Sequence, residues 1–162
     1  MSFINRYTVS GTFAAALSLT PALLHEVEGT RYEVYQDIAG VPTICEGITG
    51  PDVIPGKTYT RAECDKLLYK HIDVAKRAVD GAVKVNIPDT MRASLYSFTF
   101  NIGASGFSNS TVLRRINDGD LRGGCDAMFM WEKVTINGKK QWSKGLHNRR
   151  LKEHSWCVKD LK

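Results

Sequence analysis

Apolar residues recur every three or four positions along most of the chain, which is the spacing of one face of a helix. This pattern predicts helices near residues 64–79, 91–102, 112–116 and 125–131, and a final helix after Gly145. The run Thr60-Arg61-Ala62-Glu63 has the residues of a capping box, so the first of these helices should begin there. Thr20-Pro21 also resembles a helix start, because threonine is a common N-cap and proline is favoured at the first helical position.

The pattern changes between Tyr32 and Ile54, where short runs of β-branched and aromatic residues replace the helical spacing. Asp37-Ile38-Ala39-Gly40 interrupts these runs, which predicts a small β-hairpin or a three-stranded sheet. Asn137-Gly138 is a second tight-turn signal, between Trp131 and Trp142, and both tryptophans are expected in the core. The chain should therefore have an α+β fold, with a small β-containing lobe followed by a mainly helical lobe.

Composition and charge fit a folded domain with an anionic partner. Hydrophobic residues make up 43% of the 162 positions, charged residues 24%, and the net charge is +5. The basic residues are scattered and no nucleic-acid-binding motif accompanies them, so a basic nucleic-acid-binding domain is only a weak alternative. The apolar run from Gly11 to Leu24 is shorter than the roughly 20 residues that cross a bilayer. A helix packed on the domain is the better interpretation of it than an export signal.

The four cysteines contain no CxxC pair, which argues against a zinc site. Two disulfides or four buried thiols remain, and the spacing alone leaves all three pairings open.

Three oxygen-bearing side chains mark a candidate site. Glu28 and Asp37 are nine residues apart, and Thr43 follows six residues later. Hydrolysis of a glycosidic bond needs one protonated and one ionised carboxyl group, so two acids in unlike surroundings suit that reaction. Paired acids in a polar turn are, however, usually only solvated.

A resemblance strengthens the catalytic interpretation. The string Glu28-Gly29-x-Arg31, Tyr35-x-Asp37-x-x-Gly40-x-x-Thr43-Ile44-x-x-Gly47-x-Thr49 resembles the catalytic signature of phage-type lysozymes, the endolysins of glycoside hydrolase family 24. The likeness continues through Phe100-Asn101-Ile102-Gly103 and through Gly145-Leu146-x-x-Arg149-Arg150-x-x-Glu153. These motifs stand in the order expected for that family.

The resemblance implies a lysozyme-like fold with the active-site cleft between the lobes, and hydrolysis of the β-1,4 bond between N-acetylmuramic acid and N-acetylglucosamine in peptidoglycan, without metal or cofactor. Glu28 would be the general acid, Asp37 would activate or stabilise the attacking water, and Thr43 would help to hold that water. For a single displacement, the two carboxyl groups should lie about 6.5–9.5 Å apart. Asn101 would contact the substrate, and Arg149 would pair with the catalytic glutamate. The rival interpretation is a wall-binding module that kept the fold and lost catalysis.

One segment departs from the family pattern. Where the family usually has TIGYGHT, this chain has TICEGIT at residues 43–49. The cysteine is similar to that of exported endolysins, and the same resemblance implies the pairs Cys45–Cys64 and Cys125–Cys157. Glu46 should face opposite to Cys45 on a strand, so we expect it to be exposed, as Glu33 is.

The resemblance also implies how the molecule is organised and where it acts. We expect one lysozyme domain over residues 1–162, made of an apolar extension at 1–19, a catalytic β-containing lobe at about 20–59 and a helical lobe at about 60–162. The protein would be a monomer, made in the bacterial cytoplasm and active on the wall in the periplasm. Export by a signal-arrest-release segment and assistance by a holin are further expectations.

Overall fold

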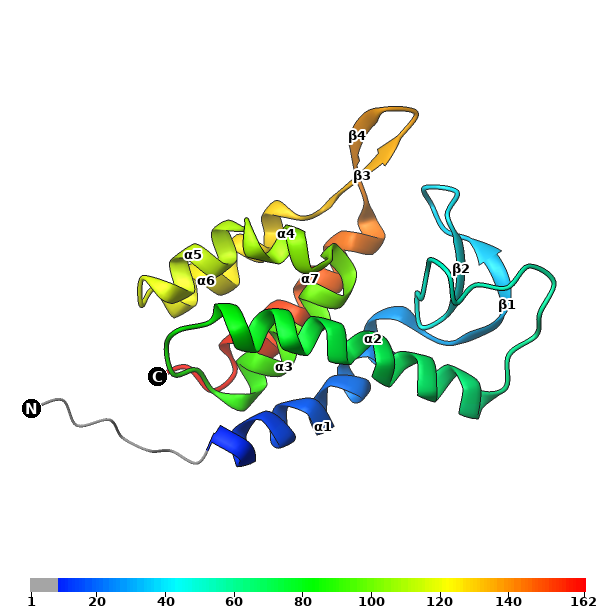
Figure 1. Ribbon diagram of the computed structural model, residues 1–162. Coiled ribbons are helices and arrows are strands. Elements are labelled where there is room, and N and C mark those ends of the chain that lie inside the picture. The colour runs from blue at the N-terminus through cyan, green and yellow to red at the C-terminus, as the bar shows by residue number, and fades with distance from the viewer. Residues whose placement is uncertain (1–8) are drawn as a thin grey trace, which may run out of the picture.

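The computed structural model describes the main chain of residues 9–162, and the side chains of residues 15–25 and 29–162. A small β lobe lies at one end of a larger helical lobe (Figure 1). The elements in chain order are α1 (Val9–Glu28), β1 (Arg31–Gln36), β2 (Pro42–Cys45), α2 (Arg61–Ala82), α3 (Asp89–Ile102), α4 (Ala104–Ser108), α5 (Thr111–Asn117), α6 (Leu121–Asp126), the 3-10 helix η1 (Ala127–Met130), β3 (Lys133–Ile136), β4 (Lys139–Trp142) and α7 (Lys144–Val158). The predicted α+β fold is confirmed.

Helix α3 is the centre of the helical lobe. Its residues from Thr90 to Thr99 are all buried, because α1, α2, α4 and α7 pack around it. The largest cluster of buried apolar side chains joins α3 to the helices that follow it, through residues such as Leu95, Phe98, Phe107 and Met128. A smaller cluster lies under the β lobe and includes Ile44, Ile48 and Tyr59.

Helix α2 connects the two lobes and begins where the capping box predicted. The Thr60 hydroxyl accepts a hydrogen bond from the Glu63 amide, and the Glu63 carboxylate accepts one from the Thr60 amide. Leu68, Ile72 and Val79 are buried at helical spacing, so one face of α2 packs against the core. The helix therefore anchors the β lobe to α3.

The predicted helix start at Thr20-Pro21 is wrong, because α1 begins eleven residues earlier, at Val9, and Pro21 lies inside it. The Thr20 hydroxyl donates to the Ala16 carbonyl within the helix and caps nothing. A proline inside a helix removes one hydrogen bond of the ladder, and burial of Ala16, Leu23 and Leu24 offsets that loss. In residues 9–162, no helix is both long enough and apolar enough to cross a membrane.

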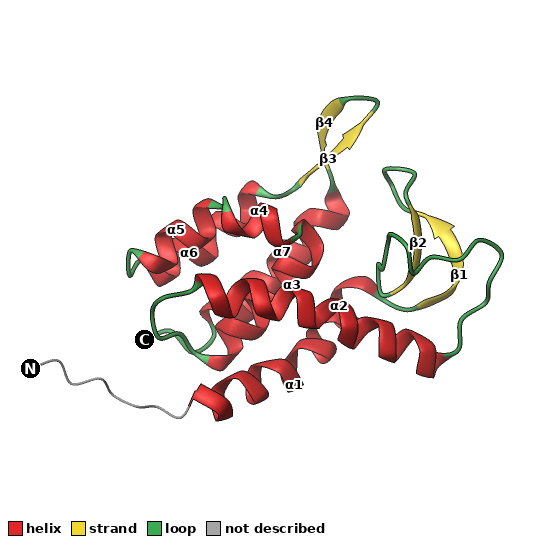
Figure 2. Cartoon of the chain, in the orientation of Figure 1, coloured by secondary structure: helices red, strands yellow, loops and turns green. Residues whose placement is uncertain are grey.

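Two antiparallel hairpins complete the fold, and both project from the same side of the molecule (Figure 2). In the first hairpin β1 pairs with β2, and Tyr35 lies opposite Thr43. In the second, β3 pairs with β4 around Asn137-Gly138, where both residues have positive φ, as a type I′ turn requires. The structure thus has a two-stranded hairpin in each lobe.

Two disulfides tie these elements together. Cys45–Cys64 joins the end of β2 to the first turn of α2, and Cys125–Cys157 joins α6 to α7. These are the two pairs that the resemblance implied. The first attaches the β lobe to the helical lobe, and the second lies in the main core.

Candidate active site

The candidate acid Glu28 is the last residue of α1. Gly29 follows it with a φ of 67° and lets the chain turn directly from the helix into β1. The side chain of Glu28 is not among those that the structure describes. Its expected distance to Asp37 and its expected pairing with Arg149 therefore stay predictions. Glu28 ends α1, and the chain passes from α1 into β1 of the β lobe (Figure 1).

Asp37 lies at the turn of the first hairpin, immediately after β1. Its Oδ1 atom accepts hydrogen bonds from the amides of Ala39 and Val41, each at 2.9 Å, while its own amide donates to the Val41 carbonyl. An aspartate that closes its own turn in this way has a fixed orientation. Among the described residues, no group donates to Oδ2, so this oxygen is available to a water molecule or a sugar hydroxyl.

Thr43 lies on β2, near Asp37 across the hairpin. Its side chain is buried, and its hydroxyl donates to the Val41 carbonyl at 2.8 Å. Because this bond uses the hydroxyl hydrogen, the oxygen can only accept a further hydrogen bond, for example from water. Tyr35 lies opposite Thr43, and burial raises the pKa of its hydroxyl group, with Arg31 opposing that shift and Asp37 adding to it.

A pocket of about 280 Å³ brings Asp37 and Asn101 together. Asp37, Ile38 and Ala39 line one wall, and side chains from the helical lobe and β3 line the other: Asn101, Ile102, Trp131, Lys133, Val134, Leu146 and Arg150. The pocket therefore spans the boundary between the lobes, as expected for the cleft. Thr43 and Arg149 are not among its lining residues.

Asn101 is held in one orientation by Arg150. The guanidinium of Arg150 donates to Asn101 Oδ1 and to Glu153 Oε2, and its Nε donates to the Trp131 carbonyl at 3.0 Å. Arg150 thus bonds to the oxygen of the Asn101 side chain, whereas the amide nitrogen has no acceptor among the described residues and can donate to a ligand. Such a donor suits the carbonyl oxygen of an N-acetyl group.

Arg149 lies in the interior of the helical lobe. Its Nε donates to Glu153 Oε1 at 2.9 Å, and its Nη2 donates to the Ser97 carbonyl at 3.1 Å. Burial lowers the pKa of this guanidinium, and the charge of Glu153 opposes the shift. The alternative of a surface arginine is excluded, since only 4% of the residue is exposed.

Sequence reasoning missed some of the residues that shape the pocket. Arg150 stands in the motif Arg149-Arg150-x-x-Glu153, and that motif was the one available signal for it. No sequence motif pointed to Lys133, because its position in the pocket depends on how β3 packs in the folded structure. The predicted burial of Trp142 is wrong: the residue is 56% exposed, because it ends an exposed strand. Trp131 is half-buried, packs edge-on against Phe98 and also lines the pocket.

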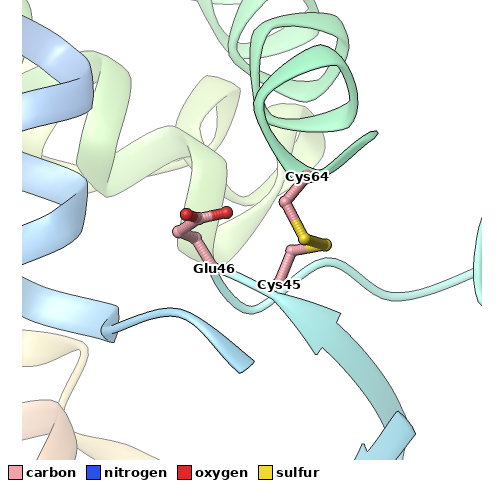
Figure 3. Close-up of side chains that lie close together, drawn as sticks. All are labelled: Cys45, Glu46 and Cys64. Atoms are coloured by element: carbon pink, nitrogen blue, oxygen red, sulfur yellow. A yellow bond between two sulfur atoms is a disulfide. The ribbon is translucent and has the colours of Figure 1, made fainter. Parts of the chain in front are cut away.

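The predicted exposure of Glu46 is also wrong, because the residue is only 1% exposed. Strand alternation ends at Cys45, whose φ of 52° lies in the left-handed region. The chain then turns, and Glu46 points into the interior together with Cys45, although the two are neighbours in sequence (Figure 3). Glu33 is exposed, as predicted.

Within the described part of the chain, one group of side chains has the composition and spacing of metal ligands: Cys45, Glu46 and Cys64. The two sulfur atoms are bonded to each other in a disulfide and offer no thiolate (Figure 3). The group therefore does not fit a metal ion in this state.

Comparisons with known proteins show the family of this chain. The family model "Phage lysozyme" matches residues 25–153. A SAR-endolysin of Bacteriophage PS119 is 47% identical over 145 residues, which cover 90% of this chain and 84% of that protein. A SAR-endolysin of Enterobacteria phage P21 is 46% identical over 145 residues, which cover 90% of this chain and 86% of that protein.

A solved structure supports the fold independently. The endolysin from Escherichia coli O157:H7 phage FAHEc1 superposes with a TM-score of 0.78 at 33% identity, covering 91% of this chain and 92% of that one. The matched family region contains Asp37, Thr43, Asn101 and Arg149. The chain thus belongs to the phage lysozyme family, as an endolysin of the muramidase class of glycoside hydrolases.

Proposed function

We propose that this endolysin hydrolyses the β-1,4 bond between N-acetylmuramic acid and N-acetylglucosamine with Glu28 as general acid and Asp37 as the group that orients water. The observation that supports the proposal is the pocket between the lobes, which both Asp37 and Asn101 line. Glu28 ends the helix that leads into this lobe. A carboxyl group on each side of the scissile bond is the arrangement that this reaction needs.

In the proposed reaction Glu28 protonates the glycosidic oxygen as the bond to the anomeric carbon breaks. Asp37 Oδ2 accepts a proton from the attacking water, and the Thr43 oxygen accepts a second hydrogen bond from that water. Asn101 donates to an N-acetyl carbonyl and fixes the sugar. Two fixed amide donors on Asp37 Oδ1 keep the other oxygen directed at the water.

Replacement of the acid tests this assignment. Glu28→Gln keeps the size of the side chain and removes its proton, so clearing of a peptidoglycan suspension should slow by at least about a hundredfold. Glu33→Gln is the matched control, since Glu33 is exposed on β1 and should leave the rate unchanged. Activity of Glu28→Gln near the wild-type level would refute the acid assignment. The rival interpretation, that the fold only binds the wall, predicts instead that the wild type itself fails to clear the suspension.

We also propose that the protein reaches the periplasm by signal-arrest-release and acts there as a monomer, with a holin assisting lysis. Support comes from the relatives in phages PS119 and P21, which are named SAR-endolysins. The two disulfides fit an oxidising compartment. Membrane fractionation of the chain with and without residues 1–19 tests the tether, and identical partitioning of both forms would contradict it.

A further inference from the structure

Glu46 is a buried acid that the proposed reaction does not use. Its Oε1 atom accepts a hydrogen bond from the Thr30 hydroxyl at 2.8 Å and lies 3.5 Å from His25 Nδ1. Its Oε2 atom is buried and has no hydrogen-bond partner in the described structure. Burial of a carboxylate with so few partners costs free energy, and an apolar side chain would fill the same space without that cost.

The two partners of Glu46 lie on either side of the candidate acid. His25 is in the last turn of α1, three residues before Glu28, and Thr30 is two residues after it, at the entry to β1. Glu46 therefore bridges the ends of the short link that carries Glu28. Thr30 is also the residue whose hydroxyl connects this link to the turn after β2.

Gly29 adds no side-chain packing to this link. A Cβ atom at Gly29 would meet no other atom within 4 Å, and both Gly29 and His25 are exposed. With a φ of 67°, Gly29 has a conformational freedom that other residues lack. The bond between Glu46 and Thr30 is a side-chain contact next to Gly29 that restricts the direction in which the chain leaves α1.

Glu46 itself is firmly placed. It follows Cys45, which is bonded to Cys64 in the first turn of α2 (Figure 3). Glu46 also lies within a turn that is closed by two backbone hydrogen bonds of 2.9 Å between Ile44 and Ile48. A continuous path thus runs from α2 through the disulfide and Glu46 to Thr30.

We propose that Glu46 is a positioning residue that fixes the link from α1 to β1 and thereby sets the place of the Glu28 carboxyl group opposite Asp37. This inference rests on the proposed role of Glu28 as the acid. Glu46 acts through Thr30 and does not touch the substrate. Its function is to hold the acid of the helical lobe in register with the water site of the β lobe.

The test uses Glu46→Ala, Thr30→Val, the double variant and Glu46→Gln, each assayed on peptidoglycan well below its melting temperature. Misplacement of the acid by a fraction of an ångström should lower kcat at least about tenfold in Glu46→Ala and Thr30→Val, with KM changed less than about twofold. The double variant should be no slower than the slower single variant, since both break the same contact. Glu46→Gln keeps an oxygen acceptor for Thr30 and should recover most of the rate.

Glu33→Gln, on the same lobe, should remain at the wild-type rate. The proposal is overturned if Glu46→Ala keeps the wild-type kcat while its melting temperature falls, or if the two single losses multiply in the double variant. Thr30→Val decides the matter if Glu46→Ala does not fold, because that change only replaces the hydroxyl group with a methyl group of similar size. An active Glu28→Gln would instead overturn the proposed function, and the kcat values of the Glu46 and Thr30 variants distinguish the two failures.

Discussion

At the scale of single residues, Asn101, the proposed substrate contact, shows how buried groups fix the orientation of a polar side chain. Arg150 is fully buried, donates to Asn101 Oδ1 and is neutralised by Glu153. The orientation of the amide is therefore fixed before any sugar arrives, which lowers the entropic cost of binding. The same arginine lines the pocket that Asp37 borders.

We predict that Asn101→Ala raises KM about threefold to tenfold with little change in kcat, because loss of one hydrogen bond weakens binding by about 0.5–1.5 kcal/mol. Asn148→Ala is a suitable control, since Asn148 is exposed on α7 and has no side-chain hydrogen bond in the described structure. Initial rates of peptidoglycan clearing over a range of substrate concentrations would give both constants. A loss confined to kcat would show that Asn101 does not act by binding substrate.

At the scale of the elements, the sequence predicts those whose signals are local. The capping box at Thr60 and the turn at Asn137-Gly138 are set by neighbouring residues, and the structure has both where the sequence placed them. The start of α1 was missed because packing against α3 and α7 outweighs the proline inside it. The place of Glu46 was missed because a left-handed Cys45 ends the strand one residue before alternation would expose Glu46. The family motif singles out Asp37 as a candidate and leaves its role a prediction, whereas the pocket that it shares with Asn101 depends on contacts between distant elements.

The capping box gives helix α2 a dependence on pH. Hydrogen bonds from the Thr60 amide and from Lys57 lower the pKa of Glu63 from 4.5 to about 2. A carboxyl group with a lowered pKa in the folded state stabilises it above the unfolded pKa, and that contribution is lost as the pH falls toward the folded pKa. We predict that Glu63→Gln has a lower melting temperature than the wild type at pH 6 and that the difference shrinks between pH 4.5 and pH 2. Melting curves at several pH values check this, and a constant difference would contradict it.

At the scale of the whole molecule, the two disulfides hold different parts of the fold. Cys125–Cys157 closes a separation of 32 residues within the main core, whereas Cys45–Cys64 connects the lobes. Cross-links of this kind restrict the unfolded chain and thereby favour the folded one. The Cys125–Cys157 bond should govern global stability, and the Cys45–Cys64 bond should govern the position of the β lobe that carries Asp37.

We predict that Cys125→Ala/Cys157→Ala lowers the free energy of unfolding by about 2–4 kcal/mol. Urea unfolding followed by tryptophan fluorescence measures this loss. A reducing agent should lower the free energy of unfolding of the wild type by more than that of the variant. The wild type loses two disulfides on reduction, whereas the variant loses only the Cys45–Cys64 bond. Equal unfolding midpoints for wild type and variant without reductant would argue against the bond.

The account as a whole is tested most directly by the new chain ends in a peptidoglycan digest. Reduction with borohydride followed by acid hydrolysis distinguishes muramic acid from glucosamine at the reducing end. The wild type should produce muramitol at a rate matching the loss of turbidity, and Glu28→Gln should produce almost none. New glucosaminitol ends, or muramitol from Glu28→Gln at the wild-type rate, would contradict the proposed bond or the proposed acid.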